Sequence, residues 1–195
     1  CFFQSIFGIG LLLLGTPTFL MFGYSYFEVL NILLPYSIII SLLQIIYHKN
    51  KDIILAKKFI KLSLPFLILS FFLLKYIHQN INFILLVSFI LIIFLTLNIF
   101  LFDKNYFKIK RINIALIFLG LLHGFTNLGG SLLTIIATNI SKNKNTILYY
   151  IASGYLIFAI FQLLFVNIFF EKLSLLNLKY IWLPILIYLL SRKIF

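Results

Sequence analysis

The stretch LLHGFTNLGGSLLTII, Leu121–Ile136, places a polar cluster inside an otherwise apolar run. His123, Asn127 and the adjacent Gly129 and Gly130 lie at its centre. About one bilayer's worth of apolar sequence encloses them, and an unsatisfied polar group costs several kcal/mol in hydrocarbon. We therefore interpret this stretch as functional, and the rest of the chain as the frame that holds it.

Composition identifies the class of protein. Of 195 residues, 63% are hydrophobic and only 10% are charged, with a mean hydropathy of +1.15. Such a chain needs the lipid bilayer as its solvent, so we expect a polytopic membrane protein. The net charge is +12, but the basic residues lie in clusters between apolar runs, as in cytoplasmic loops. Nucleic acid is therefore not the expected partner.

The chain has a single cysteine, Cys1, which excludes an internal disulfide and a cysteine metal cluster. The sequence starts without Met in an apolar run and stops at Phe195, soon after Arg192 and Lys193. We expect a chain trimmed at both ends.

Apolar runs predict an all-α bundle of about seven segments. Their ranges are Cys1–Phe22, Phe27–Tyr47, Phe59–Ile77, Phe83–Phe102, Asn113–Thr138, Thr146–Phe170 and Leu178–Leu190. In the first segment we expect a break or kink near Gly15 to Pro17, because proline removes a backbone donor. In the second, Ser37, Ser41 and Gln44 share one helical face, which we expect to face protein or water.

Basic residues predict the topology. A cluster after the second segment includes Lys57, and another follows the fourth segment at 103–111. Both should be cytoplasmic, with the N-terminus inside. However, Lys142 and Lys144 would then lie outside if the fifth segment crosses fully.

A shift of 119 residues relates the first segment to the fifth. It places Gly8 on Asn127, Gly10 on Gly129, and a glutamine, Gln4, on a histidine, His123. We interpret this as a decayed duplication, with repeats at 1–103 and 104–195. Interrupted helices in matching positions are typical of secondary transporters, whose substrate binds near the midplane. The halves are parallel if every segment crosses, and inverted if one is re-entrant.

Two blocks carry a family resemblance. GIGLLLLGTP, Gly8–Pro17, resembles the first-half signature of the sulfite exporter TauE/SafE family, and HGFTNLGGSLL, His123–Leu133, resembles its second-half signature. Departures from the pattern are Leu11, Leu12, Asn127, Ser131 and Ile136. We also expect the family's final span to be absent from this chain.

The resemblance implies a bacterial inner-membrane carrier of about eight spans for small anions, such as sulfite or sulfonates. Glycine-exposed amides at the N-terminal end of a broken helix can bind an anion without adding charge. We expect two such ends facing each other, one at Gly10 with Gly15 and one at Gly129 with Gly130. The predicted substrate-binding set is Gly8, Gly10, Gly15, Thr16, Pro17, His123, Thr126, Asn127, Gly129, Gly130 and Ser131.

Several residues keep two interpretations. His123 could couple transport to protons, or could join two helices as a neutral hydrogen-bonded residue. Glu28 could also couple protons, but near a helix start it suits the helix dipole. Gly120 and Gly124 form a small-xxx-small pair that favours close packing.

The sequence also leaves more than one class of function open. Scattered histidines and acids give no metalloprotease motif, nucleophile elbow or carboxylate pair, and the chain has no ATP-binding motif, so neither an enzyme nor a cofactor is expected. The alternative to a transporter is a membrane scaffold or partner subunit. The sequence leaves the oligomeric state, substrate and direction of transport open.

Overall fold

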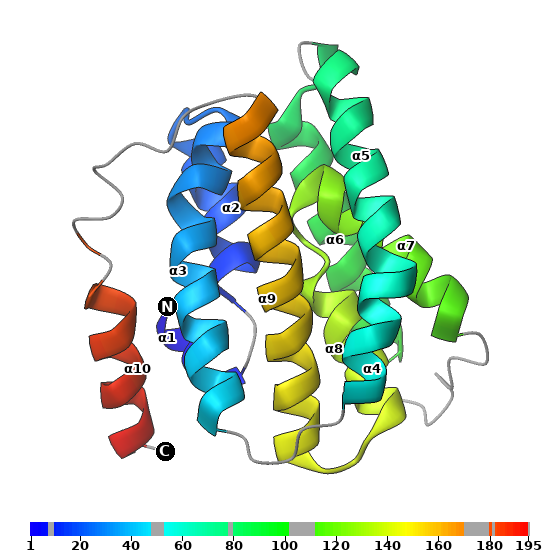
Figure 1. Ribbon diagram of the computed structural model, residues 1–195. Coiled ribbons are helices and arrows are strands. Elements are labelled where there is room, and N and C mark those ends of the chain that lie inside the picture. Colours follow the sequence, from blue (N-terminus) through cyan, green and yellow to red (C-terminus); the bar gives the residue numbers. More distant parts are fainter. Residues whose placement is uncertain are drawn as a thin grey trace.

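The computed structural model describes residues 1–7, 10–47, 53–77, 80–101, 112–169, 180 and 182–194. Every regular element within them is helical, as expected, and Figure 1 shows the helices side by side in one bundle. The elements are α1 Phe2–Phe7, α2 Leu11–Met21, α3 Tyr26–Tyr47, α4 Ile53–Lys58, the π-helical turn η1 Phe59–Ser63, α5 Leu64–Ile77, α6 Phe83–Leu101, α7 Ile112–Thr126, α8 Gly130–Ile140, α9 Lys144–Phe169 and α10 Trp182–Ile194.

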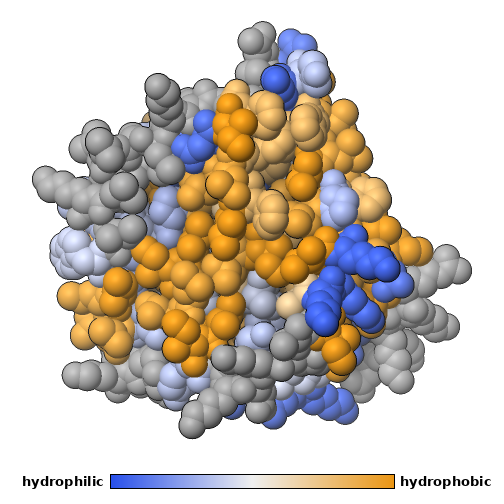
Figure 2. All heavy atoms as spheres, in the orientation of Figure 1, coloured by the Kyte–Doolittle hydropathy of each residue, from blue (hydrophilic) through white to orange (hydrophobic). Residues whose placement is uncertain are grey.

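Three described helices are long and apolar enough to cross a bilayer: Tyr26–Tyr47, Ala56–Ile77 and Lys144–Phe169. Their outer faces expose large apolar side chains, which is the arrangement that lipid favours. Figure 2 shows hydrophobic residues over the middle of the visible face, with hydrophilic residues gathered toward its edges. The protein is a multi-pass helical membrane protein.

The first segment is broken, but not where the sequence analysis placed the break. α2 continues through Gly15, Thr16 and Pro17, and the interruption lies between α1 and α2. Gly10 caps α2 with φ 128°, a backbone conformation that only glycine adopts readily. Pro17 therefore does not mark the break, whereas Gly10, the N-cap of α2, does.

The fifth segment is a re-entrant hairpin. α7 has 15 residues and α8 has 11, so at 1.5 Å per residue neither spans a core of about 30 Å. α7 runs in the same direction as α5, since Gly120 packs on Ser63 and Gly124 packs on Ser70. α8 then returns to the side from which α7 came, where α9 begins (Figure 1).

The two long helices α3 and α9 run in opposite directions, as the colours of Figure 1 show. Hydrogen bonds agree, because Tyr26 at the start of α3 and Gln162 near the end of α9 bond to the adjacent residues Gly124 and His123. The repeats are therefore inverted, which the sequence alone left undecided.

Re-entry also removes the conflict in the positive-inside count. Lys142 and Lys144 now lie on the side where α3 ends and α4 begins, together with Lys57 and Lys58 (Figure 1). The lysines at 49 and 51 and the cluster at 103–111 are outside the described residues. Figure 1 places the first residue near the mid-height of α3, so the side of the N-terminus stays a prediction.

The helix bounds follow the shift of 119 closely. It maps α2, Leu11–Met21, onto α8, Gly130–Ile140, residue for residue. The same shift places α3 on α9 within three residues, and α5 on α10 within one residue at the start. It also aligns LPFLI at 64–68 with LPILI at 183–187, a sequence signal of the repeat that the sequence analysis missed.

In each repeat, the helix that follows the long helix packs on the opposite repeat; these helices are α5 and α10. α5 lies against α7 and α9, whereas α10 lies against α1 and α3. α2 packs on α3 and α8 packs on α9 within their own repeats. Each broken helix is therefore flanked by a long helix of its own repeat and a third helix from the other, so the halves interlock.

Small residues set the distance between α5 and α7. A Cβ on Gly124 would lie 2.5 Å from the Cβ of Ser70, and one on Gly120 would collide with the Ser63 carbonyl. The close-packing interpretation of this glycine pair is confirmed. Gly120 makes its contact at Ser63, the last residue of η1. There the N–H of Leu64 bonds to Phe59 O. The next residue is Pro65, whose missing backbone donor disfavours a regular α-turn.

Cysteine labelling tests the re-entrant topology. In a Cys1→Ser background, we expect Lys57→Cys and Lys142→Cys to react with a membrane-impermeant thiol reagent from the same face. Tyr24→Cys, between α2 and α3, should react from the opposite face, because α3 crosses the bilayer. Labelling of residues 57 and 142 from opposite faces would contradict re-entry.

Gly120→Ala tests the packing of α7 on η1. The added methyl meets backbone that cannot rotate away, so we expect a loss of about 1–3 kcal/mol of stability. Thermal unfolding in detergent measures it. Ile114→Ala is the control on the same helix, because Ile114 is exposed toward lipid and should change stability far less.

Candidate functional site

The break between α7 and α8 is formed by three residues, Asn127 to Gly129. Asn127 has φ 60°, and it is the one described residue other than glycine with a positive φ. Asparagine tolerates this left-handed conformation better than most residues do. Gly129 then caps α8, so the chain reverses within a few residues of a fully buried turn.

Side chains from three helices satisfy the backbone carbonyls near the end of α7. Tyr26 of α3 donates its hydroxyl to Gly124 O at 3.2 Å, and Ser70 of α5 donates to Leu121 O at 3.1 Å. Gln162 of α9 donates Nε2 to His123 O at 3.4 Å. His123 O also accepts from Asn127 N–H at 2.8 Å, so Gly124 O is the one of these three carbonyls that lacks its own backbone donor. Together the three bonds attach the end of α7 to α3, α5 and α9.

The geometry assigns the tautomer of His123. The N–H of Gly129 donates to Nδ1 of His123 at 3.1 Å, so Nδ1 carries a lone pair in the structure. A neutral imidazole then holds its proton on Nε2. That Nε2 is buried and has no hydrogen-bond partner in the structure. His123 therefore presents a free donor inside the protein.

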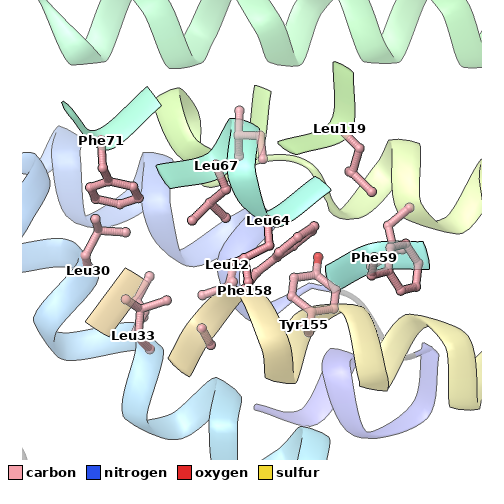
Figure 3. Packing of buried hydrophobic residues seen from close by; sticks show 14 of the residues in the cluster. Leu12, Leu30, Leu33, Phe59, Leu64, Leu67, Phe71, Leu119, Tyr155 and Phe158 are labelled. Atoms are coloured by element: carbon pink, nitrogen blue, oxygen red, sulfur yellow. The ribbon is translucent and has the colours of Figure 1, made fainter. Parts of the chain in front are cut away.

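Two residues of α9 that the sequence analysis left outside the site lie against this break. The hydroxyl of Tyr155 contacts Gly130, the first residue of α8, and has no hydrogen-bond partner. Gln162 keeps a buried Oε1 without a partner. Figure 3 shows the Tyr155 hydroxyl pointing away from α9 into the bundle. The seven-residue spacing of Tyr155 and Gln162, two turns of one helix face, was the available signal.

Asn127 links the two broken segments. Its Nδ2 lies 3.0 Å from Oγ1 of Thr16, and both side chains are fully buried. Thr16 is in the middle of α2, six residues or about 9 Å beyond Gly10. The expectation that the two helix ends face each other is therefore wrong, because the inverted repeats slide the N-termini of α2 and α8 past each other.

The other predicted site residues have varied positions. Thr126 is buried beside Asn127, where its hydroxyl donates to Leu122 O and accepts from Leu128 N–H. Ser131 is partly buried, with Oγ 3.5 Å from Leu128 O. Gly15 packs against Leu33 of α3.

Pro17 lies inside α2, and Gly10 belongs to the first break. Gly8 is outside the described residues. The structure therefore gathers Thr16, His123, Thr126, Asn127, Gly129 and Gly130 around the second break, and separates Gly15 and Pro17 from it.

Glu28 has a structural position. The N–H of Ser25 donates to its carboxylate at 2.7 Å, and its own N–H donates to Ser25 Oγ at 3.4 Å. This is a capping box at the start of α3, on an exposed turn. The helix-start interpretation accounts for Glu28, and nothing places its carboxylate near the break.

The first break has its own polar cluster. Nε2 of Gln4 lies 3.3 Å from Ser37 Oγ and 3.2 Å from Ser41 Oγ, and Gln44 donates to Gln4 O at 2.6 Å. The shared face of Ser37, Ser41 and Gln44 thus faces protein, as predicted. The unpartnered atoms here are the amide oxygens of Gln4 and Gln44, whereas the second break also offers donors.

Among the described residues, no three His, Cys, Asp or Glu side chains group as metal ligands. The buried side chains of the described ranges also include no Asp, Glu, Lys or Arg. The second break is therefore a neutral, donor-bearing site at the start of a helix.

Comparison with known families agrees with this architecture. The family model described as "Sulfite exporter TauE/SafE" matches residues 1–191. Neither the curated proteins nor the solved structures contain a significant match. Because the family model covers nearly the whole chain, this protein belongs to the sulfite exporter TauE/SafE family of membrane transporters.

Proposed function

We propose that the protein is a secondary transporter that carries a small anion, a sulfur oxyanion or organosulfonate such as sulfite, across the bacterial cytoplasmic membrane. Its repeats divide near residues 103 and 104, and the substrate binds at the break between α7 and α8. Membership of a transporter family supports the class of function. The chemistry of the break supports the sign of the charge.

Unpartnered donors at the second break carry the proposal. Nε2 of His123 and the hydroxyl of Tyr155 are buried without partners. The first-turn N–H groups of α8, at residues 130–132, have no intrahelical acceptor by helix geometry. Together with the positive end of the α8 dipole, these donors suit an anion.

Close packing favours a second candidate function. His123, Asn127 and Thr16 have no exposed surface, and the position of a Cβ on Gly129 is already occupied by the His123 side chain. A scaffold or partner subunit would have such a closed interior. A transporter would have it in an occluded state and would open it by moving α8 relative to α9.

Thermal unfolding against a panel of anions separates the two candidates. A ligand that binds only the folded state stabilises it by about 2.7 kcal/mol at a hundred times its Kd. We expect sulfite or a sulfonate to raise the melting temperature of the detergent-solubilised protein, with chloride as the ionic-strength control. No selective shift at millimolar concentrations would favour the scaffold.

Asn127→Gly sharpens this experiment. Glycine accepts φ 60° but loses the amide that bonds Thr16, so we expect a smaller anion-induced shift in a folded protein. Asn139→Ala is the matched control, because Asn139 lies exposed near the end of α8, where its Nδ2 donates to Ile135 O of the same helix. An equal loss in both variants would argue against a role for the break.

Gly129→Ala tests transport directly. Its Cβ would lie 2.7 Å from the His123 Cβ and 2.8 Å from Nδ1, so the ring must move and the Gly129 N–H bond is disturbed. We expect anion flux into proteoliposomes to fall at least about tenfold, because a displaced His123 ring would lose its charge-assisted hydrogen bond to the anion.

Gly154→Ala is the matched steric control for this flux measurement. Its Cβ would lie 2.8 Å from the Leu133 Cδ2 atom, which can rotate away. We expect flux close to that of the wild type. Wild-type flux in Gly129→Ala would remove the α7–α8 break as the binding site.

A further inference from the structure

The second break contains no charge of its own. All described residues buried around it are neutral, and the sequence from 112 to 141 contains no Lys, Arg, Asp or Glu. An anion that enters must therefore be stabilised by dipoles alone. The cost of removing an ion from water rises with the square of its charge, so a dianion costs about four times as much as a monoanion of equal size.

Two side chains that carry unpartnered donors lie beside the start of α8. The Tyr155 hydroxyl contacts Gly130, and the adjacent Gly129 contacts the His123 ring. The two rings meet edge to face, with centroids 6.0 Å apart. A small anion at the first turn of α8 would thus be within reach of side chains from both α7 and α9, and not only of the helix end.

Gln162 limits the charge further. Its Nε2 faces a backbone carbonyl, His123 O, so the amide orientation is fixed and Oε1 is the remaining atom. That buried oxygen has no donor in the structure. It would repel a second anionic oxygen, but it can accept a hydrogen bond from the hydroxyl of a singly protonated oxyanion.

The Gly129 bond opposes protonation of His123. A second proton would have to sit on Nδ1, where the N–H of Gly129 already points. From α9, the ring also faces the neutral phenol of Tyr155, the side chain of Phe158 and the neutral amide of Gln162. No described neighbour from α5 or α8 brings a buried carboxylate. His123 is therefore built to act as a neutral donor through Nε2.

We propose that the α7–α8 break selects a monoanionic oxyanion, held by the Tyr155 hydroxyl, the Nε2–H of neutral His123 and the first-turn amides of α8. This inference rests on the proposed function and specifies the charge state of its substrate. Tyr155 becomes a binding residue, and Gln162 becomes a positioning residue that holds the end of α7 and disfavours a dianion.

Calorimetric titration of the full chain in detergent tests the charge selectivity. Methanesulfonate is a monoanion and sulfate is a dianion over the neutral range, whereas sulfite changes from one to the other. We expect methanesulfonate to bind equally in mildly acidic and mildly alkaline buffer, sulfite to weaken as the pH rises, and sulfate to bind at least about tenfold more weakly.

The outcomes separate the two proposals. Sulfate that binds as well as methanesulfonate overturns the charge selectivity but leaves an anion transporter. Methanesulfonate binding that strengthens with acid and takes up one proton overturns the neutral role of His123 and supports proton coupling. If none of the three ions, methanesulfonate, sulfite and sulfate, binds, the proposed function itself fails.

Tyr155→Phe tests the new binding residue. It removes an unpartnered buried hydroxyl and keeps the packed ring, so thermal stability should hold or rise while methanesulfonate affinity falls about tenfold. Tyr188→Phe is the matched control, because its hydroxyl bonds to Leu43 O between α10 and α3. Unchanged affinity in Tyr155→Phe would overturn the assignment.

Discussion

Two helices that stop inside a bilayer leave backbone groups without intrahelical partners, and the surrounding helices must supply those partners. At the end of α7 the hydroxyl of Tyr26 supplies a partner to the carbonyl of Gly124. Glutamine amides add a bond at each helix end, from Gln44 to the carbonyl of Gln4 and from Gln162 to the carbonyl of His123, which also accepts from Asn127 N–H. In each repeat the glutamine comes from the long helix that follows the break. The break, its long helix and their spacing therefore depend on one another.

The two breaks share this arrangement but differ in which polar groups they leave without hydrogen-bond partners. Around Gln4 the hydroxyls of Ser37 and Ser41 occupy the amide donors, and oxygen acceptors are what is left without partners. Around His123 the Gly129 amide occupies the acceptor nitrogen, and a donor is left. The first break therefore leaves acceptors and the second leaves donors, which is why the proposed anion site is at the second break.

Much of this arrangement was predictable from the sequence. Apolar runs located the helices, and a shift of 119 residues paired Gly10 with Gly129, which are the N-caps of α2 and α8. The break in the first segment was misplaced because Pro17 can remain inside a helix when its neighbours supply the packing. Re-entry was not readable from hydropathy, since two short helices in series resemble one long span.

Tyr155 shows why the site was harder to predict than the fold. In the sequence it is one of three tyrosines in the first half of α9, and an aromatic residue in an apolar helix is usually part of the core. Its role depends on Gly130, 25 positions earlier, whose missing side chain brings the start of α8 against the hydroxyl. Only the three-dimensional packing of α8 on α9 joins them.

Interlocking of the repeats constrains how such a site can open. α5 comes from the first repeat but holds α7 through Ser70 and the small faces of Gly120 and Gly124, so α7 moves with α5. α8 contacts α9 through residues around Gly130 and Leu133, and the left-handed turn at Asn127 separates it from α7. Rotation about that turn would move the first-turn amides of α8 while the carbonyls of α7 keep their partners, so the proposed anion-binding end would move without exposing the other end of the break to lipid.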